Sequence, residues 1–253
     1  MQYSILSSVW LFECFAHTEL IQIAPNKQYV CIKQIFVNVY FISGLGADKT
    51  VFQKIKLPAL YTISHIEWIT PLPDEPLPSY ANRLSSQINT QSPFAVVGVS
   101  FGGMLAAEIY RQLKPAKTII ISSIWSQKQL PAYLKATGKI KFHNIIPAWF
   151  FTHVNAVTLW LFGARTPDEK QLLATIFKNT DVQFMRWAFT AIGNWQSSFI
   201  EKPTNVFHIH GTHDRILPLG NMKPDVVIEG GEHLMVYSRA DEINLLLEKE
   251  LLK

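Results

Sequence analysis

Short apolar runs and helical patterns alternate along most of this chain. The apolar runs are rich in β-branched residues, and they predict strands at residues 37–42, 65–70, 94–99, 117–124, 205–211 and 225–228. The run at 94–99 is continuously apolar, which is typical of a strand buried on both sides of a sheet. Hydrophobic residues at helical spacing predict helices at residues 49–55, 79–88, 104–113 and 234–252. The alternation predicts an α/β fold, with a mostly parallel sheet, helices on both faces and right-handed crossovers.

Local signals indicate where two of these helices begin. Asp48 precedes the first helical pattern and Ser79 opens the second. Short polar side chains at such positions accept hydrogen bonds from the free amides of a first helical turn. We therefore expect Asp48 and Ser79 to be the N-caps. Residues 71–78 contain four prolines and predict a stiff loop that cannot continue a sheet.

The alternation stops at residues 125–203, where no convincing strand pattern occurs. Five of the seven tryptophans fall in this segment: Trp125, Trp149, Trp160, Trp187 and Trp195. Because the segment lies between two predicted strands, we interpret it as a helical cap inserted into a core of residues 37–124 and 204–253. Aromatic side chains in a cap supply apolar area for a ligand, although most of them are expected to pack the cap onto the core.

Residues 1–36 fit this plan poorly. An apolar stretch at residues 5–16 has no positive region before it and no small-residue cleavage site after it, so it is a poor match to a secretory signal. Residues 20–24 and 29–32 predict a hairpin on the edge of the sheet. The alternative is a non-native extension from a start codon assigned too far upstream, because the recognisable fold begins near residue 36.

Composition and charge narrow the class of protein. With 253 residues, 48% of them hydrophobic and 17% charged, the chain can bury a full core, which excludes a disordered chain. The formal net charge is only +4 and the cationic residues are scattered, so we expect no nucleic-acid partner. Cys14 and Cys31 are too few for a disulfide framework and lack the C-x-x-C spacing of a zinc site, which suits a cytoplasmic protein.

One segment approaches the length of a membrane span. Residues 142–163 contain no Asp, Glu, Lys or Arg. Polar residues such as Asn144 and Asn155 interrupt the segment, however, and a crossing here would put the two halves of the sheet on opposite sides of a bilayer. We therefore expect no stable membrane span and interpret the segment as a buried or substrate-facing cap helix. Transient membrane contact is left open.

The join between the strand at 94–99 and the following helix carries the strongest chemical signal. Its sequence is Gly98-Val-Ser-Phe-Gly102, with Ser100 at the centre. A sharp turn between a strand and a helix brings the flanking backbones so close that side chains on Gly98 and Gly102 would collide. Such a turn exposes the Ser100 hydroxyl at the strand's end, beside the free N–H groups of the helix.

This element resembles the nucleophile elbow of the α/β-hydrolase superfamily, whose pattern is G-x-S-x-G. A serine nucleophile needs a general base, and the base needs a carboxylate that fixes its tautomer. Asp214 follows a later predicted strand and His233 follows the last one, which is the order serine, acid, histidine of this superfamily. All three positions lie beyond the carboxyl ends of parallel strands, where open α/β sheets place their sites. The resemblance implies Ser100 as nucleophile, Asp214 as acid and His233 as base.

The resemblance also implies two backbone N–H groups that would stabilise an oxyanion. In this superfamily the glycine-rich loop after an early strand supplies one of them, and Leu45 stands at the matching position of the loop Ser43-Gly-Leu-Gly-Ala-Asp48. The other N–H belongs to Phe101, immediately after the nucleophile. Many members have His-Gly where this chain has Ser43-Gly44, and an ordinary glycine turn is the alternative.

Three histidines in a later predicted strand and the loop after it raise a metal site as an alternative. His208 and His210 share one face of the strand among apolar positions, which favours burial over metal ligation. His213 lies in the loop, but no strand end brings it toward Ser100 as naturally as His233. We expect no metal and no cofactor.

The implied reaction is hydrolysis of an apolar carboxylic ester or thioester through an acyl-enzyme on Ser100. An apolar cap without a cluster of charges favours a small substrate with an apolar acyl group. Two alternatives stay open, because this fold serves many functions. One is a non-catalytic ligand-binding protein, and the other is a C–C bond hydrolase or lyase that uses the same three residues. The sequence favours the ester hydrolase because serine, acid and histidine are all present.

Overall fold

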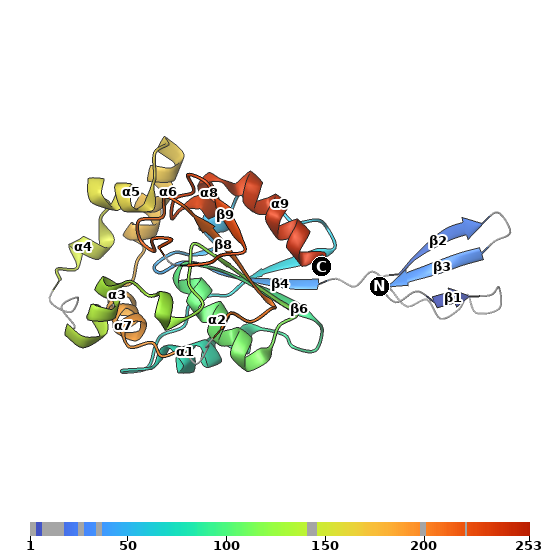
Figure 1. The fold of residues 1–253 in the computed structure, drawn as a ribbon, viewed down its shortest axis with the longest axis horizontal. Helices are drawn as coiled ribbons and strands as arrows, with labels where there is room; N and C mark the ends of the chain where they lie inside the picture. Colours follow the sequence, from blue (N-terminus) through green and yellow to red (C-terminus); the bar gives the residue numbers. More distant parts are fainter. Residues whose placement is uncertain are drawn as a thin grey trace.

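A parallel sheet forms the centre of the chain in the computed structural model, which describes residues 4–6, 18–24, 28–33, 37–140, 146–197, 201–220 and 222–253. The sheet has six strands in the order β5-β4-β6-β7-β8-β9, and every neighbouring pair is parallel (Figure 1). The strands are β4 (Val37–Ile42), β5 (Tyr61–His65), β6 (Phe94–Val99), β7 (Lys117–Ile121), β8 (Val206–Gly211) and β9 (Val226–Ile228). The predicted α/β fold class is confirmed.

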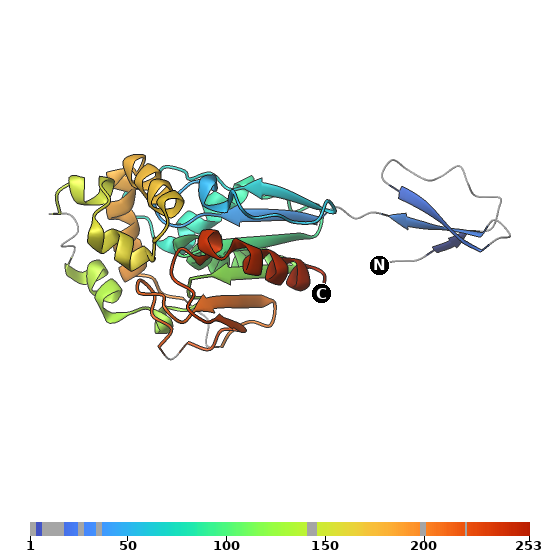
Figure 2. The same ribbon diagram turned by 90° about the horizontal axis from the view of Figure 1, so that it is seen from above.

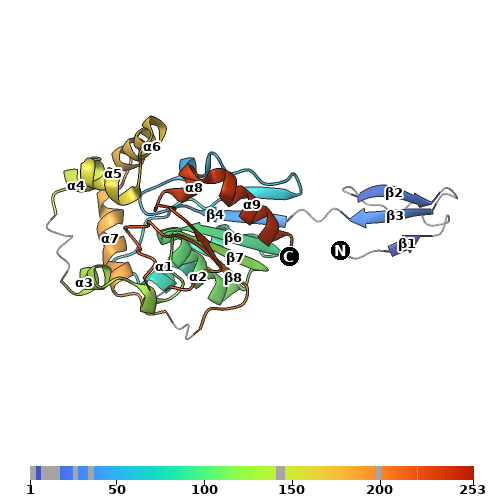
Figure 3. The same ribbon diagram turned by 45° about the horizontal axis from the view of Figure 1, so that its top comes forward.

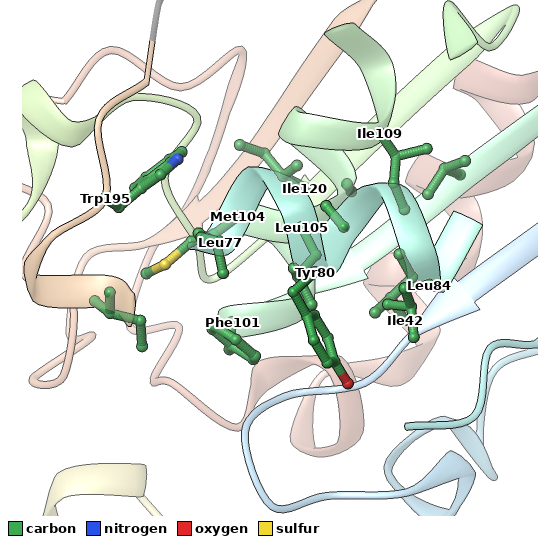
Figure 4. Packing of buried hydrophobic residues seen from close by; sticks show 14 of the residues in the cluster. Ile42, Leu77, Tyr80, Leu84, Phe101, Met104, Leu105, Ile109, Ile120 and Trp195 are labelled. Atoms are coloured by element: carbon green, nitrogen blue, oxygen red, sulfur yellow. The ribbon is translucent and has the colours of Figure 1, made fainter. Parts of the chain in front are cut away.

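Helices cover both faces of this sheet. They are η1 (Lys49–Phe52), α1 (Leu77–Leu84), η2 (Ser85–Gln87), α2 (Phe101–Leu113), α8 (Met235–Ser238) and α9 (Ala240–Leu251). Helices α1 and α2 pack on one face, whereas η1, α8 and α9 pack on the other (Figure 1). Along β4, Ile42 points into the first core and Phe41 into the second, because successive side chains of a strand face opposite sides. Figure 4 shows the first core, with Tyr80 of α1 beside Leu105 of α2.

The predicted strand at residues 65–70 is wrong in position, since β5 spans Tyr61–His65. After β5 the chain turns away from the sheet to bond with α1. The Tyr80 hydroxyl donates to the Ile69 carbonyl (2.9 Å) and accepts from the Ile69 N–H (3.2 Å). These bonds replace the ladder that a longer strand would need.

The predicted N-cap at Ser79 is also wrong. Helix α1 begins two residues earlier, at Leu77, and Pro76 occupies the N-cap position. Proline is tolerated at the start of a helix because the first N–H groups have no helical partner. The Ser79 hydroxyl instead donates to Glu75 Oε1 (3.1 Å). The remainder of the predicted helix at 79–88 is the separate turn η2.

Three other predicted elements are shorter than expected. Asp48 does cap η1, because its carboxylate accepts from the Thr50 N–H (2.9 Å), but η1 is a single 3-10 turn. Strand β7 ends at Ile121 because Ser122 has a φ of 46°, outside the extended region. The C-terminal pattern forms two helices, which meet at Arg239.

The described residues between β7 and β8 contain helices and no strand. They are η3 (Gln127–Gln129), α3 (Ala132–Ile140), α4 (Trp149–Thr152), α5 (Ala156–Phe162), α6 (Pro167–Lys178) and α7 (Val182–Gly193). Figures 1 and 3 show them at the end of the sheet opposite the C-terminus. Helices α3 and α7 approach closely at Gly138 and Gly193, where a Cβ on Gly193 would lie 2.1 Å from the Gly138 nitrogen. We call residues 125–203 the helical insertion.

The first strands form a sheet of their own. They are β1 (Ser4–Leu6), β2 (Thr18–Ala24) and β3 (Gln28–Lys33), in the order β1-β3-β2 with antiparallel pairing. The predicted hairpin therefore exists as β2 and β3, but its position on the edge of the main sheet is wrong, because β5 and β9 are the edges there (Figure 2). Cys14 and most of the stretch considered as a secretory signal lie outside the described residues.

The uncharged segment at 142–163 contains α4 and α5, separated by residues in other conformations. Within the described ranges, no helix combines the length and the apolar character that a membrane crossing needs.

Candidate active site

Ser100 occupies a strained turn between β6 and α2. Its φ of 54° and ψ of −120° are unusual for a residue with a side chain. The turn depends on close backbone approaches, because a Cβ on Gly98 would lie 2.3 Å from the Gly102 carbonyl oxygen, and one on Gly102 would lie 2.3 Å from the Ile42 oxygen. The Ser123 hydroxyl also donates to the Ser100 carbonyl (2.6 Å). The turn therefore holds the Ser100 side chain at the end of β6.

The structure brings Ser100, His233 and Asp214 together from the ends of three strands. Ser100 Oγ lies 2.9 Å from His233 Nε2, and His233 Nδ1 lies 2.8 Å and 3.0 Å from the two oxygens of Asp214. Since the carboxylate can only accept, the His233 Nδ1–H donates to Asp214, and Nε2 is left to accept from the Ser100 hydroxyl. Asp214 and His233 are both buried.

The Asp214 carboxylate is held as an anion by its surroundings. Its oxygens also accept from the N–H groups of Ile216 (3.0 Å) and Leu217 (2.8 Å). Burial by itself raises the pKa of Asp214, but His233 and the Leu217 amide outweigh it and hold the pKa of this carboxyl below its ordinary value. Asp214 can therefore orient His233 and stabilise a positive charge on its ring.

Two residues that line the same cavity as Ser100 have backbone N–H groups with no hydrogen-bond acceptor among the described residues. These residues are Leu45, in the loop after β4, and Phe101, the first residue of α2. The loop touches the turn, because a Cβ on Gly44 would lie 3.5 Å from the Ser100 Cβ. The Ser43 hydroxyl donates to the Ala47 carbonyl (2.7 Å) and fixes the loop's shape.

Ser100 and His233 open into a cavity of about 740 Å³ that lies between the core and the helical insertion. This volume is within the range of small-molecule sites. Most of the lining is apolar, with Phe162, Ile176 and Met185 among the side chains from the insertion. The Phe162 ring meets the His233 ring edge to face, with the ring centroids 5.5 Å apart. An apolar group bound at Ser100 would therefore find an apolar environment.

Next to His233 lies an ion-pair cluster that the sequence did not predict. Glu232 Oε1 accepts from Arg165 Nη2 (2.8 Å) of the helical insertion and from Arg215 Nη1 (2.9 Å). Burial raises the pKa of Glu232, but the two guanidinium groups outweigh it and lower this pKa. Gly163 makes room for the cluster, since a Cβ there would lie 2.1 Å from Glu232 Oε2. Arg165 lies far from the other two residues in sequence, so no local pattern marks the cluster.

The three histidines considered as metal ligands have different surroundings. His208 and His210 are fully buried, with His208 Nε2 3.1 Å from His210 Nδ1, and the His210 Nε2–H donates to the Leu217 carbonyl (2.7 Å). Burial lowers the pKa of both side chains, in the case of His208 to about 3. His213 is exposed. In the part of the chain that the structure describes, no three His, Cys, Asp or Glu side chains are grouped to hold a metal ion.

Comparisons with known proteins identify the fold. No protein-family profile matches this chain, and no curated protein matches it. The 2-hydroxy-6-oxo-6-phenylhexa-2,4-dienoate hydrolase of Rhodococcus sp. strain RHA1 matches with a TM-score of 0.63 and 16% identity, over 93% of this chain and 100% of that chain. A thermophilic esterase from Thermogutta terrifontis matches with a TM-score of 0.62 and 13% identity, over 93% and 98% of the two chains. An epoxide hydrolase from Bacillus megaterium matches with a TM-score of 0.62 and 14% identity, over 86% of this chain and 94% of that chain.

These three proteins share the α/β-hydrolase fold, and this chain has that fold as well. At such low identity the likeness extends to the fold alone, because one fold carries many reactions. Any assignment of chemistry therefore depends on the site itself.

Proposed function

We propose that this protein is a serine hydrolase that cleaves an apolar carboxylic ester or thioester through an acyl-enzyme. One observation supports this above all: the hydrogen-bonded series from Ser100 through His233 to Asp214 opens into an apolar cavity of about 740 Å³. The names of the structural neighbours, which include an esterase and an epoxide hydrolase, agree with a hydrolase in general terms.

The proposed reaction has two acyl transfers. His233 Nε2 takes the hydroxyl proton while Ser100 Oγ attacks the substrate carbonyl, and the N–H groups of Leu45 and Phe101 donate to the oxyanion. The tetrahedral intermediate collapses, and the leaving alcohol or thiol departs with the proton from His233. Water then attacks the acyl-enzyme with His233 as base, which releases the carboxylic acid and restores Ser100. Asp214 keeps the His233 ring in the required tautomer and stabilises its protonated form.

The helical insertion would act as the cap of this site. Its side chains supply much of the cavity lining, so they would determine how long an acyl chain the enzyme accepts. Each buried methylene contributes about 0.8 kcal/mol, so kcat/KM is expected to rise by about fourfold per methylene until the cavity is filled.

Mass spectrometry after treatment with a fluorophosphonate tests the proposal. We expect a single adduct on Ser100 in the wild-type protein and in the control variant Ser86→Ala, which alters an exposed serine on η2. Ser100→Ala should give no adduct, and its hydrolysis of p-nitrophenyl esters should fall by about 10⁴-fold or more.

Other outcomes would favour the other functions. A folded wild-type protein that forms no adduct and turns over no ester or thioester would contradict the proposal. Saturable binding of an apolar ligand that Ser100→Ala leaves intact would then indicate a ligand-binding protein. Turnover of a diketone by a protein that resists acylation would indicate a C–C hydrolase or lyase.

A further inference from the structure

Exposed apolar side chains are concentrated on the helical insertion. Among the described residues, eleven large hydrophobic side chains are exposed, and six of them fall between residues 133 and 160. Trp149 and Trp160 are each 59% exposed, and Val157 is 63% exposed. Single exposed apolar residues are ordinary on a protein surface, but a group of them indicates an interaction site.

Three of these side chains line the cavity, and two more lie against residues of its lining. Tyr133, Phe150 and Val157 are exposed and also line the cavity. The Trp149 ring lies 6.1 Å from the ring of Phe150, measured between centroids. The Trp160 ring lies 5.0 Å from the guanidinium carbon of Arg215, which is itself a lining residue. We call Tyr133, Trp149, Phe150, Val157 and Trp160 the apolar rim.

The stretch of sequence that carries the apolar rim has charges of one sign. No Asp or Glu occurs in the sequence from residue 109 to residue 167, whereas lysines and arginines do. Lys135 and Lys139, both exposed, lie on α3 with Tyr133. Arg165 follows α5, and its side chain is 72% exposed. Its partner Glu232 belongs to the core and is shared with Arg215.

This combination fits one kind of occupant. Tryptophan and tyrosine are favoured at the boundary between headgroups and acyl chains, and nearby lysines attract anionic lipids. A second copy of the chain fits less well, because a two-fold symmetric contact would bring together two stretches that carry only positive charges. Helices α4 and α5 have four and seven residues, which suits contact with a surface and not a crossing.

We propose that the apolar rim docks reversibly on an anionic phospholipid bilayer, with the cavity mouth facing the acyl chains. This inference does not rest on the proposed hydrolase activity, because it depends only on the exposed side chains and their charge. Docking would give the cavity direct access to molecules dissolved in the bilayer. Because it depends partly on lysines, it should weaken as salt increases.

Vesicle flotation with the Ser100→Ala protein tests the docking, since this variant would leave the lipids unchanged. We expect it to float with vesicles of phosphatidylcholine and about 30% phosphatidylserine, and to float much less with phosphatidylcholine alone. Raising the salt from about 0.1 M to about 0.5 M should release it.

Paired variants in the same Ser100→Ala background locate the surface. Trp149→Ser with Trp160→Ser should weaken binding by about tenfold or more. Lys135→Gln with Lys139→Gln should weaken it by about fivefold per lysine. The matched control, Leu245→Ser with Leu252→Ser, removes two exposed leucines of 68% and 63% exposure from the C-terminal region and should bind like its parent. Thermal unfolding of each variant shows that it is folded.

Several results would overturn the proposal. The first is a folded parent that does not float, and the second is equal loss of binding in the tryptophan and leucine pairs. Binding that is indifferent to phosphatidylserine would also contradict it. A dimer that forms without vesicles and dissociates in the tryptophan pair would assign the rim to a second copy. The fluorophosphonate experiment on the wild-type protein is independent of all these results, so the two proposals can fail separately.

Discussion

The buried His208 makes a measurable prediction about stability at acidic pH. Burial, reinforced by the neighbouring His210, lowers the pKa of His208 from 6.5 to about 3. Between these two values the unfolded chain binds a proton that the folded protein does not bind. Stability contributed by the neutral ring is therefore complete above about pH 6.5 and is lost progressively as the pH falls toward about 3.

The size of the effect follows from this interval. One pKa unit corresponds to about 1.4 kcal/mol. Lowering the pH from about 7 to about 5 should therefore lower the free energy of unfolding by about 2 kcal/mol through His208 alone. His210 and His65 also have lowered pKa values, so the wild-type protein should lose more than this amount. The share of His65 is common to the wild type and to a variant that lacks only His208, whereas His210 lies 3.1 Å from His208 and titrates together with it.

Urea unfolding of the wild type and of His208→Gln at both pH values measures how much of the pH dependence of stability requires His208. Glutamine keeps a side-chain N–H for the bond to His210 but does not titrate. Between about pH 7 and about pH 5, the free energy of unfolding should fall in both proteins, and the fall should be about 2 kcal/mol smaller in the variant than in the wild type. His153→Gln, which alters an exposed histidine after α4, should behave as the wild type does. Equal losses in the wild type and His208→Gln would refute the reasoning.

Two other predictions concern the helix that begins at the nucleophile turn. Gly102→Ala should destabilise the fold by about 1–3 kcal/mol and abolish acylation, because its Cβ would lie 2.3 Å from two carbonyl oxygens. Gly44→Ala, with no neighbour closer than 3.5 Å, is the control for stability, and similar urea midpoints for the two variants would contradict the prediction. Trp195→Phe should cost about 1.5–3 kcal/mol, because it removes the 2.8 Å bond from the indole N–H to the buried Glu108 carboxylate. The exposed Trp149→Phe should change thermal unfolding little, and an equal loss there would argue against this role for Trp195.

The central strands were the most predictable part of the fold. Residues 37–42 and 94–99 form β4 and β6 with the predicted bounds, because both strands are covered on both faces and most of their residues are apolar. The edge strand β5 was placed too late along the chain. Its burial varies from residue to residue, and the apolar residues after it, such as Ile69, pack against α1 instead of extending the sheet.

The candidate site was predictable wherever a local pattern marks it. The glycines around Ser100 are needed for close backbone approach, so they are visible in the sequence, and Asp214 and His233 follow strands that are visible as well. The pairing of Arg165 with Glu232 was not predictable, because it joins residues 67 positions apart through the fold. In the sequence, Glu232 is visible only as the residue that precedes His233.

This pairing connects the helical insertion with the loops that carry Asp214 and His233. Arg215 directly follows Asp214, and Glu232 directly precedes His233, so the two ion pairs of Glu232 join both loops to Arg165 of the insertion. The Leu234 N–H also donates to a carbonyl of α5 (3.1 Å). A displacement of α5 from the core would therefore break bonds next to both residues.

The same bonds relate the cavity mouth to the reacting atoms. Arg215 Nη1 donates to the Trp160 carbonyl (2.9 Å) as well as to Glu232, so a residue of the apolar rim is tied to the loop of Asp214. These bonds fix Trp160 relative to the loop that carries Asp214. If the rim docks on a bilayer, an apolar molecule that enters the cavity from the acyl chains would meet Ser100 in the lining of that cavity.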